Sequence, residues 1–103
     1  MLLTQSHAQA WTSVGYELNG YVYTLCVYKD ELYAGGTFTE DDDNTATFIA
    51  RWNGREWMDA GDGMNGKVSA LCVYKGELYA GGEFTTAGYE PAASIARWNG
   101  KRW

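Results

Sequence analysis

The chain has 103 residues, which limits it to one small domain with a modest hydrophobic core of its own. Hydrophobic residues make up 46% of the chain and aromatic residues 16%, a composition that excludes a disordered segment. The formal net charge of −5 argues against nucleic acid and against an anionic membrane surface as partners, because both would repel the chain. No apolar run approaches the length of about 20 residues that spans a bilayer.

Residues 1–10 are predicted to form an N-terminal arm, because they do not align with the rest of the chain. The tripeptide Ala8-Gln9-Ala10 resembles the end of a signal-peptide cleavage site. The basic region and the apolar stretch that precede such a site are missing, so the chain as written has no complete signal peptide. The compartment therefore stays unassigned.

From residue 11 onward the sequence repeats with a step of 46 residues. A period of about 40 to 50 residues predicts a β-propeller or a related array rather than an ordinary globular domain. We expect a first repeat over residues 11–56 and a second over residues 57–103. The longest matching segments are residues 25–29 with 71–75, 31–36 with 77–82, and 49–54 with 95–100.

The first two strands of each repeat have a clear signature. Residues 22–28 and 68–74 are rich in β-branched and aromatic residues with apolar groups on both faces, which is typical of a strand covered on both sides. A short turn at residues 75–76 leads into a second strand over residues 77–84. The paired glycines inside this strand indicate close approach of a neighbouring backbone.

A third strand is predicted over residues 48–52 and again over residues 94–98. It runs into Asn-Gly, the strongest short-range signal for a hairpin, in which both central positions need positive φ. The fourth strand starts near Arg55 and carries Trp57. No segment shows sustained 3.6-residue periodicity, so we expect an all-β fold in which each repeat is a four-stranded propeller blade.

The repeat resembles the kelch pattern, with Gly35-Gly36, Trp52, Asn53-Gly54 and Trp57 at the matching places. It is more similar to a bacterial kelch-like repeat, whose characteristic pieces here are residues 61–68, 78–85 and 95–103. The resemblance covers residues 11–103. It implies a β-propeller and no enzyme activity, and the chain departs from the family in carrying two repeats where members usually carry many.

Two blades do not close a ring, so the sequence predicts self-association. The chain stops at Trp103, where the last strand of the second blade begins, and residues 10–18 of a neighbouring chain match that strand. We expect a head-to-tail homo-oligomer with strand exchange, six-bladed as a trimer or, as second choice, eight-bladed as a tetramer. A fragment of a longer array and a designed origin are the alternatives. The expected interface residues are Trp11, Val14, Trp98 and Trp103.

The two cysteines, Cys26 and Cys72, lie one period apart on equivalent strands. Stacked sheets are roughly 10 Å apart, and the alpha carbons of a disulfide lie within about 7 Å of each other. We therefore expect free, buried thiols. With His7 as the single histidine, no zinc site or cysteine-histidine nucleophile is expected, and no cofactor is implied.

An acidic run, with Asp41, Asp42 and Asp43 at its centre, lies between the second and third strands of the first repeat. Clustered carboxylates are calcium ligands, but the alternating spacing and the turn glycine of a calcium loop are missing. A solvated loop is favoured over a metal site.

Binding is the expected further role of such a ring, with a protein or a glycan as the ligand. A carbohydrate-binding lectin with sites between the blades is the alternative to a plain scaffold, because small bacterial fucose-binding lectins have a similar two-repeat layout. Aromatic faces stack on sugars and charged groups bind hydroxyls. Catalysis is not expected, since no nucleophile-histidine-acid set is present. The candidate ligand residues are Trp52, Trp98, Arg51, Arg97, Glu31 and Glu77.

Overall fold

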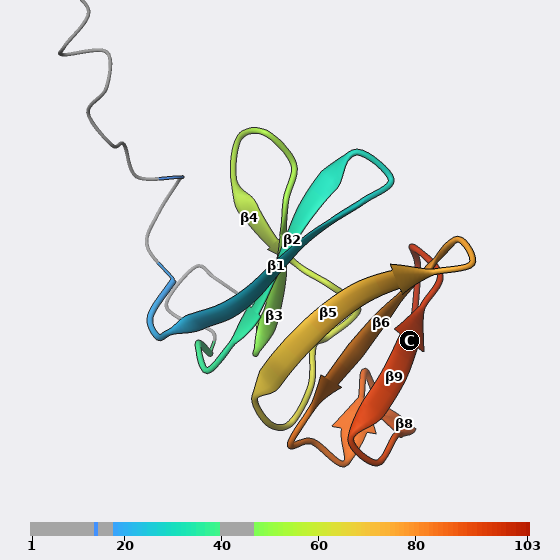
Figure 1. Cartoon of the computed structure of the whole chain (residues 1–103). Helices are drawn as coiled ribbons and strands as arrows, with labels where there is room; N and C mark the ends of the chain where they lie inside the picture. Colours follow the sequence, from blue (N-terminus) through green and yellow to red (C-terminus); the bar gives the residue numbers. More distant parts are fainter. Residues whose placement is uncertain (1–13, 15–17, 40–46) are drawn as a thin grey trace, which may run out of the picture.

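The structure is a computed structural model that describes Val14, residues 18–39 and residues 47–103 (Figure 1). Within these residues the chain consists of antiparallel β-sheets and contains no helix, which confirms the predicted all-β class. It follows that no helix in this part is long and apolar enough to cross a membrane.

The first repeat folds into a four-stranded antiparallel sheet, here called sheet 1. Its order follows the sequence, and the predicted number of strands is confirmed. Leu32 pairs with Trp52 across the central strands, and Trp52 pairs with Trp57 at the outer edge. The strands are β1 (Val22–Tyr28), β2 (Glu31–Gly36), β3 (Ile49–Trp52) and β4 (Trp57–Asp59).

The second repeat gives a three-stranded antiparallel sheet, here called sheet 2, with the same register one period later. It contains β5 (Val68–Tyr74), β6 (Glu77–Gly82) and β9 (Ile95–Trp98). No described strand pairs with the outer edge of β9, whereas β4 covers the equivalent edge of β3.

A small hairpin of β7 (Thr86–Ala87) and β8 (Glu90–Pro91) lies between β6 and β9. The sequence predicted a loop there. Two residues per strand are too few to show an alternating pattern, so sequence periodicity carries no signal for this hairpin.

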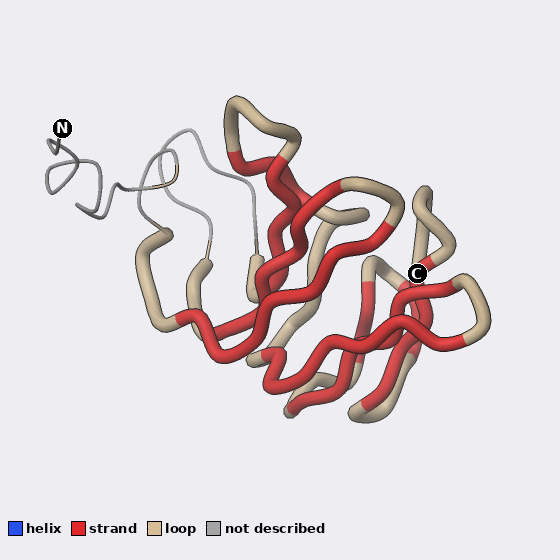
Figure 2. Tube along the Cα trace, turned by 45° about the horizontal axis from the view of Figure 1, so that its top comes forward, coloured by secondary structure: helices blue, strands red, loops and turns tan. Residues whose placement is uncertain are grey.

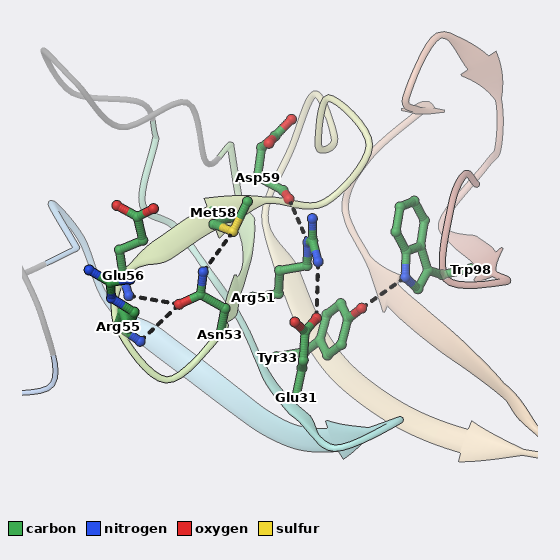
Figure 3. Close-up of polar contacts among 9 residues, drawn as sticks. All are labelled: Glu31, Tyr33, Arg51, Asn53, Arg55, Glu56, Met58, Asp59 and Trp98. Atoms are coloured by element: carbon green, nitrogen blue, oxygen red, sulfur yellow. Dashed lines mark hydrogen bonds and ion pairs between the residues drawn. The ribbon is translucent and has the colours of Figure 1, made fainter.

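The turns correct one prediction. Asn53-Gly54 does not form a two-residue hairpin: Gly54 alone has positive φ (100°), and the turn spans the four residues between β3 and β4. The Oδ1 atom of Asn53 accepts hydrogen bonds from the backbone N–H groups of Arg55 (2.8 Å) and Glu56 (2.9 Å), which favours this wider turn (Figure 3). The paired positive φ values occur instead at Lys29 (49°) and Asp30 (65°), in the tight turn between β1 and β2.

Three predicted strand limits were also wrong. β6 ends at Gly82 rather than at residue 84. β3 begins at Ile49 and β9 at Ile95, because Phe48 and Ser94 have left-handed φ values of 67° and 72°. The second glycine of each pair confirms the predicted close approach of backbone. A Cβ atom on Gly36 would collide with the carbonyl oxygen of Tyr21, and one on Gly82 with that of Lys67.

The two sheets lie side by side, with β5 next to β1 and β2 (Figures 1 and 2). One hydrophobic cluster fills the space between them, and it draws side chains from both sheets and from the connection after β4. Figure 2 shows that the strands form the body of the molecule and that loops lie at its ends. The main core is thus a contact between two repeats rather than the interior of either one.

Candidate functional site

The contact between the sheets, called here the internal joint, joins two different faces. Sheet 1 contributes Tyr28, Tyr33 and Ile49, which define its leading face. Sheet 2 contributes Val68, Leu78 and Trp98, which define its trailing face. All six side chains are at most 4% exposed. Full burial of one large apolar side chain stabilises the fold by about 1.5–3 kcal/mol.

Three hydrogen bonds cross the internal joint. The indole Nε1–H of Trp98 donates to the hydroxyl of Tyr33 (3.0 Å) in a fully buried position (Figure 3). The Tyr28 hydroxyl donates to the carbonyl oxygen of Gly76 (3.1 Å), and the backbone N–H of Leu71 donates to Oγ1 of Thr24 (3.2 Å). Because these polar groups are paired, their burial does not carry the cost of unsatisfied donors.

Burial has an electrostatic consequence for Tyr33. Desolvation raises the pKa of its phenol, and the charge of Glu31 adds to this effect. The hydrogen bond from Trp98 and the charge of Arg51 act in the opposite direction and are weaker than desolvation. The neutral phenol is therefore the form that the joint favours.

Close packing at the joint requires a glycine. A Cβ atom on Gly35 would lie 2.5 Å from Cγ1 of Val68, too close for any real contact. One period later, a Cβ atom on Gly81 would meet nothing closer than the carbonyl oxygen of Ser94, at 3.8 Å. The two glycines are equivalent in sequence but only Gly35 is covered.

The same difference extends over parts of both sheets. Among the described residues no second sheet packs on the leading face of sheet 2 or on the trailing face of sheet 1, although Phe38, Leu18 and Trp57 cover Ala34 and Ala50 on the latter. On the leading face of sheet 2, Tyr74 is 56% exposed and Ile95 is 63% exposed, while their counterparts Tyr28 and Ile49 are buried. On the trailing face of sheet 1, Val22 is 44% exposed, while its counterpart in sheet 2 is fully buried. The chain thus exposes, on each of these two faces, counterparts of side chains that the internal joint buries.

A repeated hydrogen bond fixes the place of Val14. The indole of Trp57 donates to the carbonyl oxygen of Val14 (2.9 Å), and the indole of Trp103 donates to that of Ala60 (2.8 Å). Val14 and Ala60 are 46 residues apart. Val14 therefore occupies the same position beside sheet 1 that Ala60, the residue after β4, occupies beside sheet 2.

The expected interface residues are distributed over different places. Val14 is 49% exposed and lies beside sheet 1, while Trp11 is outside the described residues. Trp98 and Trp103 lie at the internal joint, with ring centroids 5.0 Å apart. The open trailing face instead carries their counterparts Trp52 and Trp57, whose centroids are 5.3 Å apart.

The expected ligand residues pair within the sheets. Arg51 binds Glu31 at 3.0 Å and also donates from Nε to the carbonyl oxygen of Asp59 (Figure 3). Arg97 binds Glu77 at 3.1 Å. The Arg51 side chain is 29% exposed and that of Arg97 is 65% exposed, because the internal joint partly covers the first pair alone.

The two tryptophans of the expected ligand set do not share a surface with these ion pairs. Neighbouring residues of a strand point to opposite faces, so Trp52 lies on the trailing side and Arg51 on the leading side of sheet 1. Trp98 belongs to sheet 2, and its hydrogen bond across the joint goes to Tyr33 rather than to Glu31 or Arg51 (Figure 3). At 2% exposure it offers no free ring face on which a sugar could stack.

The cysteines are free, as predicted, but the predicted burial is wrong: Cys26 is partly exposed and Cys72 is exposed. The reason is that Cys72 lies on β5, two residues before the exposed Tyr74. Partial burial and the charge of Cys72 raise the pKa of the Cys26 thiol, which disfavours a reactive thiolate there.

No group of three or more potential metal ligands occurs among the described residues. The acidic residues 41–43, a weaker sequence prediction of a metal site, lie outside that part of the chain.

An open groove of about 580 Å³ beside the β7–β8 hairpin was not expected from the sequence. It lies between the connection after β4, the hairpin and the last turn of the chain. Aromatic and charged residues from three separate segments meet there, and of these the sequence analysis singled out Trp103 alone. The lining residues are Gly61, Asp62, Ala87, Gly88, Tyr89, Glu90, Lys101, Arg102 and Trp103.

Comparison with models of protein families, with curated proteins and with solved structures gives no match. Function is therefore argued from the two open faces and the groove themselves.

Proposed function

We propose that the chain is a non-enzymatic β-propeller module that assembles head to tail with copies of itself into a closed ring. One observation carries this proposal: Tyr28, Ile49 and Val68, which are buried at the internal joint, have exposed counterparts on the two outer faces of the chain, at Tyr74, Ile95 and Val22. A surface that matches another surface of the same molecule forms a heterologous contact, and such contacts close into a ring when the rotation permits.

The internal joint serves as the template for the contact between chains. In that contact Ile95 of one copy takes the place of Ile49 and packs against Val22 of the next copy. The indole of Trp52 would donate to the hydroxyl of Tyr79, as Trp98 donates to Tyr33 within the chain. Exposed apolar side chains on both sides would become buried, which is the main driving force for association.

The free edge of β9 supports strand exchange at the same contact. β4 covers the equivalent edge of β3, and an uncovered edge tends to pair with another chain. We propose that residues 10–18 of a neighbouring copy supply the missing strand. Of that segment the structure describes Val14 and Leu18, and Val14 holds the place that follows such a strand. Three copies would give six blades and four copies eight.

We propose a binding role rather than catalysis for this ring. The carboxylates that recur by symmetry, Glu31 and Glu77, are each held in an ion pair with arginine. They are therefore engaged as structural charges rather than left free for general acid or base chemistry. A protein or a glycan bound at the rim is the role that fits a ring of this kind.

Light scattering at about 10 µM, roughly tenfold above a Kd of about 1 µM, tests the assembly. We expect three or four times the mass of one chain. The variant Ile95→Asp should be monomeric and retain its β-sheet circular dichroism, since this side chain is exposed within the chain. The matched variant Ile49→Asp places the same charge in the buried joint and should unfold. A monomeric wild-type chain, or Ile95→Asp that assembles like wild type, would contradict the proposal.

A further inference from the structure

The groove beside the β7–β8 hairpin is built entirely within one chain, and none of its lining residues belongs to the leading face of sheet 2 or the trailing face of sheet 1. Its wall residue Trp103 lies next to the β9 edge that is proposed for strand exchange. Its volume of about 580 Å³ lies within the range of about 300–1,000 Å³ that is typical of small-molecule sites. A ligand bound there would leave the leading face of sheet 2 and the trailing face of sheet 1 free.

Trp103 forms a fixed aromatic wall of this groove. Its indole N–H is bonded to the carbonyl oxygen of Ala60 (2.8 Å), and its ring packs at 44° to that of Trp98. Gly61 leaves room for both rings, since a Cβ atom there would lie 2.5 Å from Trp98 and 3.3 Å from Trp103. A ring held in this way presents its surface without losing conformational freedom on binding.

The opposite wall is the β7–β8 hairpin, and backbone contacts hold it in place. The N–H of Gly88 donates to the carbonyl oxygen of Gly63 (2.7 Å), and Ala87 forms an isolated β-bridge with Met64. Tyr89 lies at the tip of this hairpin with 86% of its surface exposed. The groove therefore has one aromatic ring fixed in its wall and a second one free at its rim.

Four charged side chains line the groove: the carboxylates of Asp62 and Glu90 and the cations of Lys101 and Arg102. None of them forms an ion pair with another described residue. The formal charges cancel, so a ligand of either net charge would meet repulsion as well as attraction. A neutral ligand rich in hydroxyls would donate to the carboxylates and accept from the cations.

From these features we propose that the groove binds a small neutral saccharide. The C–H face of a sugar ring would stack on an aromatic ring of the groove, and its hydroxyls would reach the charged rim. This site differs from the expected one, because Trp98, Arg51 and Arg97 do not line it. It also does not depend on ring formation, although a ring would present several copies and raise the avidity.

A glycan array that carries neutral, sialylated and sulfated glycans tests the class of ligand, and calorimetry with the best neutral mono- or disaccharide gives its Kd. We expect binding confined to neutral glycans. Glu90→Gln and Asp62→Asn should each weaken it about tenfold or more, because each removes a charged hydrogen-bond acceptor. Glu56→Gln is the matched control, since Glu56 is exposed, occupies the counterpart position of Arg102 and lies outside the groove.

The proposal is overturned by an array without neutral hits, by binding confined to anionic glycans, or by binding that Glu90→Gln and Asp62→Asn leave unchanged. The same titration on the monomeric Ile95→Asp variant separates this proposal from that of the ring. If that variant binds the sugar with the wild-type Kd per chain, the site is complete within the single chain. The proposed saccharide site would then hold even if the proposed ring did not. Loss of binding in the folded Ile95→Asp variant would contradict a site complete within one chain.

Discussion

Trp98 donates its indole N–H to the hydroxyl of Tyr33 across the internal joint, at 3.0 Å and out of contact with water. One period away, the counterparts Trp52 and Tyr79 lie on the two opposite open faces of the chain. In the proposed ring, each copy would therefore carry the donor for one neighbour and the acceptor for the other. This relationship provides matched pairs of variants, one for the fold and one for the assembly.

Tyr33→Phe should lower the free energy of unfolding by about 1–3 kcal/mol, because it leaves the buried indole N–H of Trp98 without an acceptor. Tyr79→Phe, one period later, should leave the stability of the separate chain almost unchanged and weaken association instead. Urea denaturation measures the first effect and light scattering across a dilution series the second. Equal effects of both variants on unfolding of the dissociated chain would show that the two tyrosines are not in different environments.

Alkaline pH should act on Tyr33 in a defined direction. Burial raises the pKa of this phenol, so the folded state holds the proton more tightly than the unfolded state does. The resulting contribution to stability is complete below the ordinary tyrosine pKa of about 10 and is lost as the pH rises through the folded pKa.

Urea midpoints at about pH 8 and about pH 11, on either side of the ordinary tyrosine pKa, measure this effect. The wild-type chain should lose more stability between the two than Tyr33→Phe does, while other titrating groups act on both proteins alike. Tyr89→Phe, a change at an exposed phenol, should follow wild type. A Tyr33→Phe variant with the full wild-type loss would contradict the assignment to Tyr33.

The joint between chains should lack one hydrogen bond that the internal joint has. Within the chain, Oγ1 of Thr24 accepts from the backbone N–H of Leu71. The counterpart of Thr24 is Ala70, which has no hydroxyl, so the N–H of Leu25 in the next copy would find no such partner. The internal joint is therefore expected to be the stronger of the two.

Ala70→Thr should restore that bond and tighten association about threefold to tenfold, the equivalent of one net hydrogen bond of roughly 0.5–1.5 kcal/mol. Ala70→Val is the control, since it adds similar bulk and β-branching without the hydroxyl. A dilution series followed by light scattering measures both. If Val and Thr strengthen association equally, packing rather than the hydrogen bond accounts for the gain.

The sequence was sufficient to predict the strands that recur in the two repeats. Apolar strands, the tight turns and the period itself predicted the all-β class and the four strands of sheet 1, because strand alternation and turn residues are local signals. The prediction of a two-residue hairpin at Asn53-Gly54 was wrong, and the reason is also local. The side chain of Asn53 caps two backbone N–H groups, and this bond competes with the two-residue hairpin.

The candidate site was harder to predict, because equivalent residues of the two repeats differ only in how other parts of the molecule pack against them. Ile49 and Ile95 are identical in sequence, yet one is buried and the other is 63% exposed. No local pattern distinguishes them, since the difference arises from what lies against each face. The groove is similar: Asp62, Glu90 and Lys101 are far apart in sequence and meet only through the fold.

Gly81→Ala offers the sharpest test of the ring. In the separate chain a Cβ atom at Gly81 meets only Ser94, at 3.8 Å, so the fold should tolerate it. In a joint that copies the internal one, that Cβ atom would take the place of a Cβ on Gly35, 2.5 Å from a valine methyl group, here Val22 of the next copy. Overpacking of this kind costs about 1–3 kcal/mol, enough to shift assembly to higher concentration about fivefold or more.

Its matched variant, Gly35→Ala, places the same Cβ atom against Val68 within the single chain. It should lower the free energy of unfolding of that chain by about 1–3 kcal/mol. Shortening the opposing valine should reverse each effect separately. Val22→Ala should restore assembly to Gly81→Ala, and Val68→Ala should relieve the clash in Gly35→Ala. If Gly81→Ala assembles at wild-type concentration, or if Val22→Ala fails to rescue it, the contact between copies does not repeat the geometry of the internal joint. Rescue by Val22→Ala alone, and not by Val68→Ala, would place Gly81 against the trailing face of a second copy.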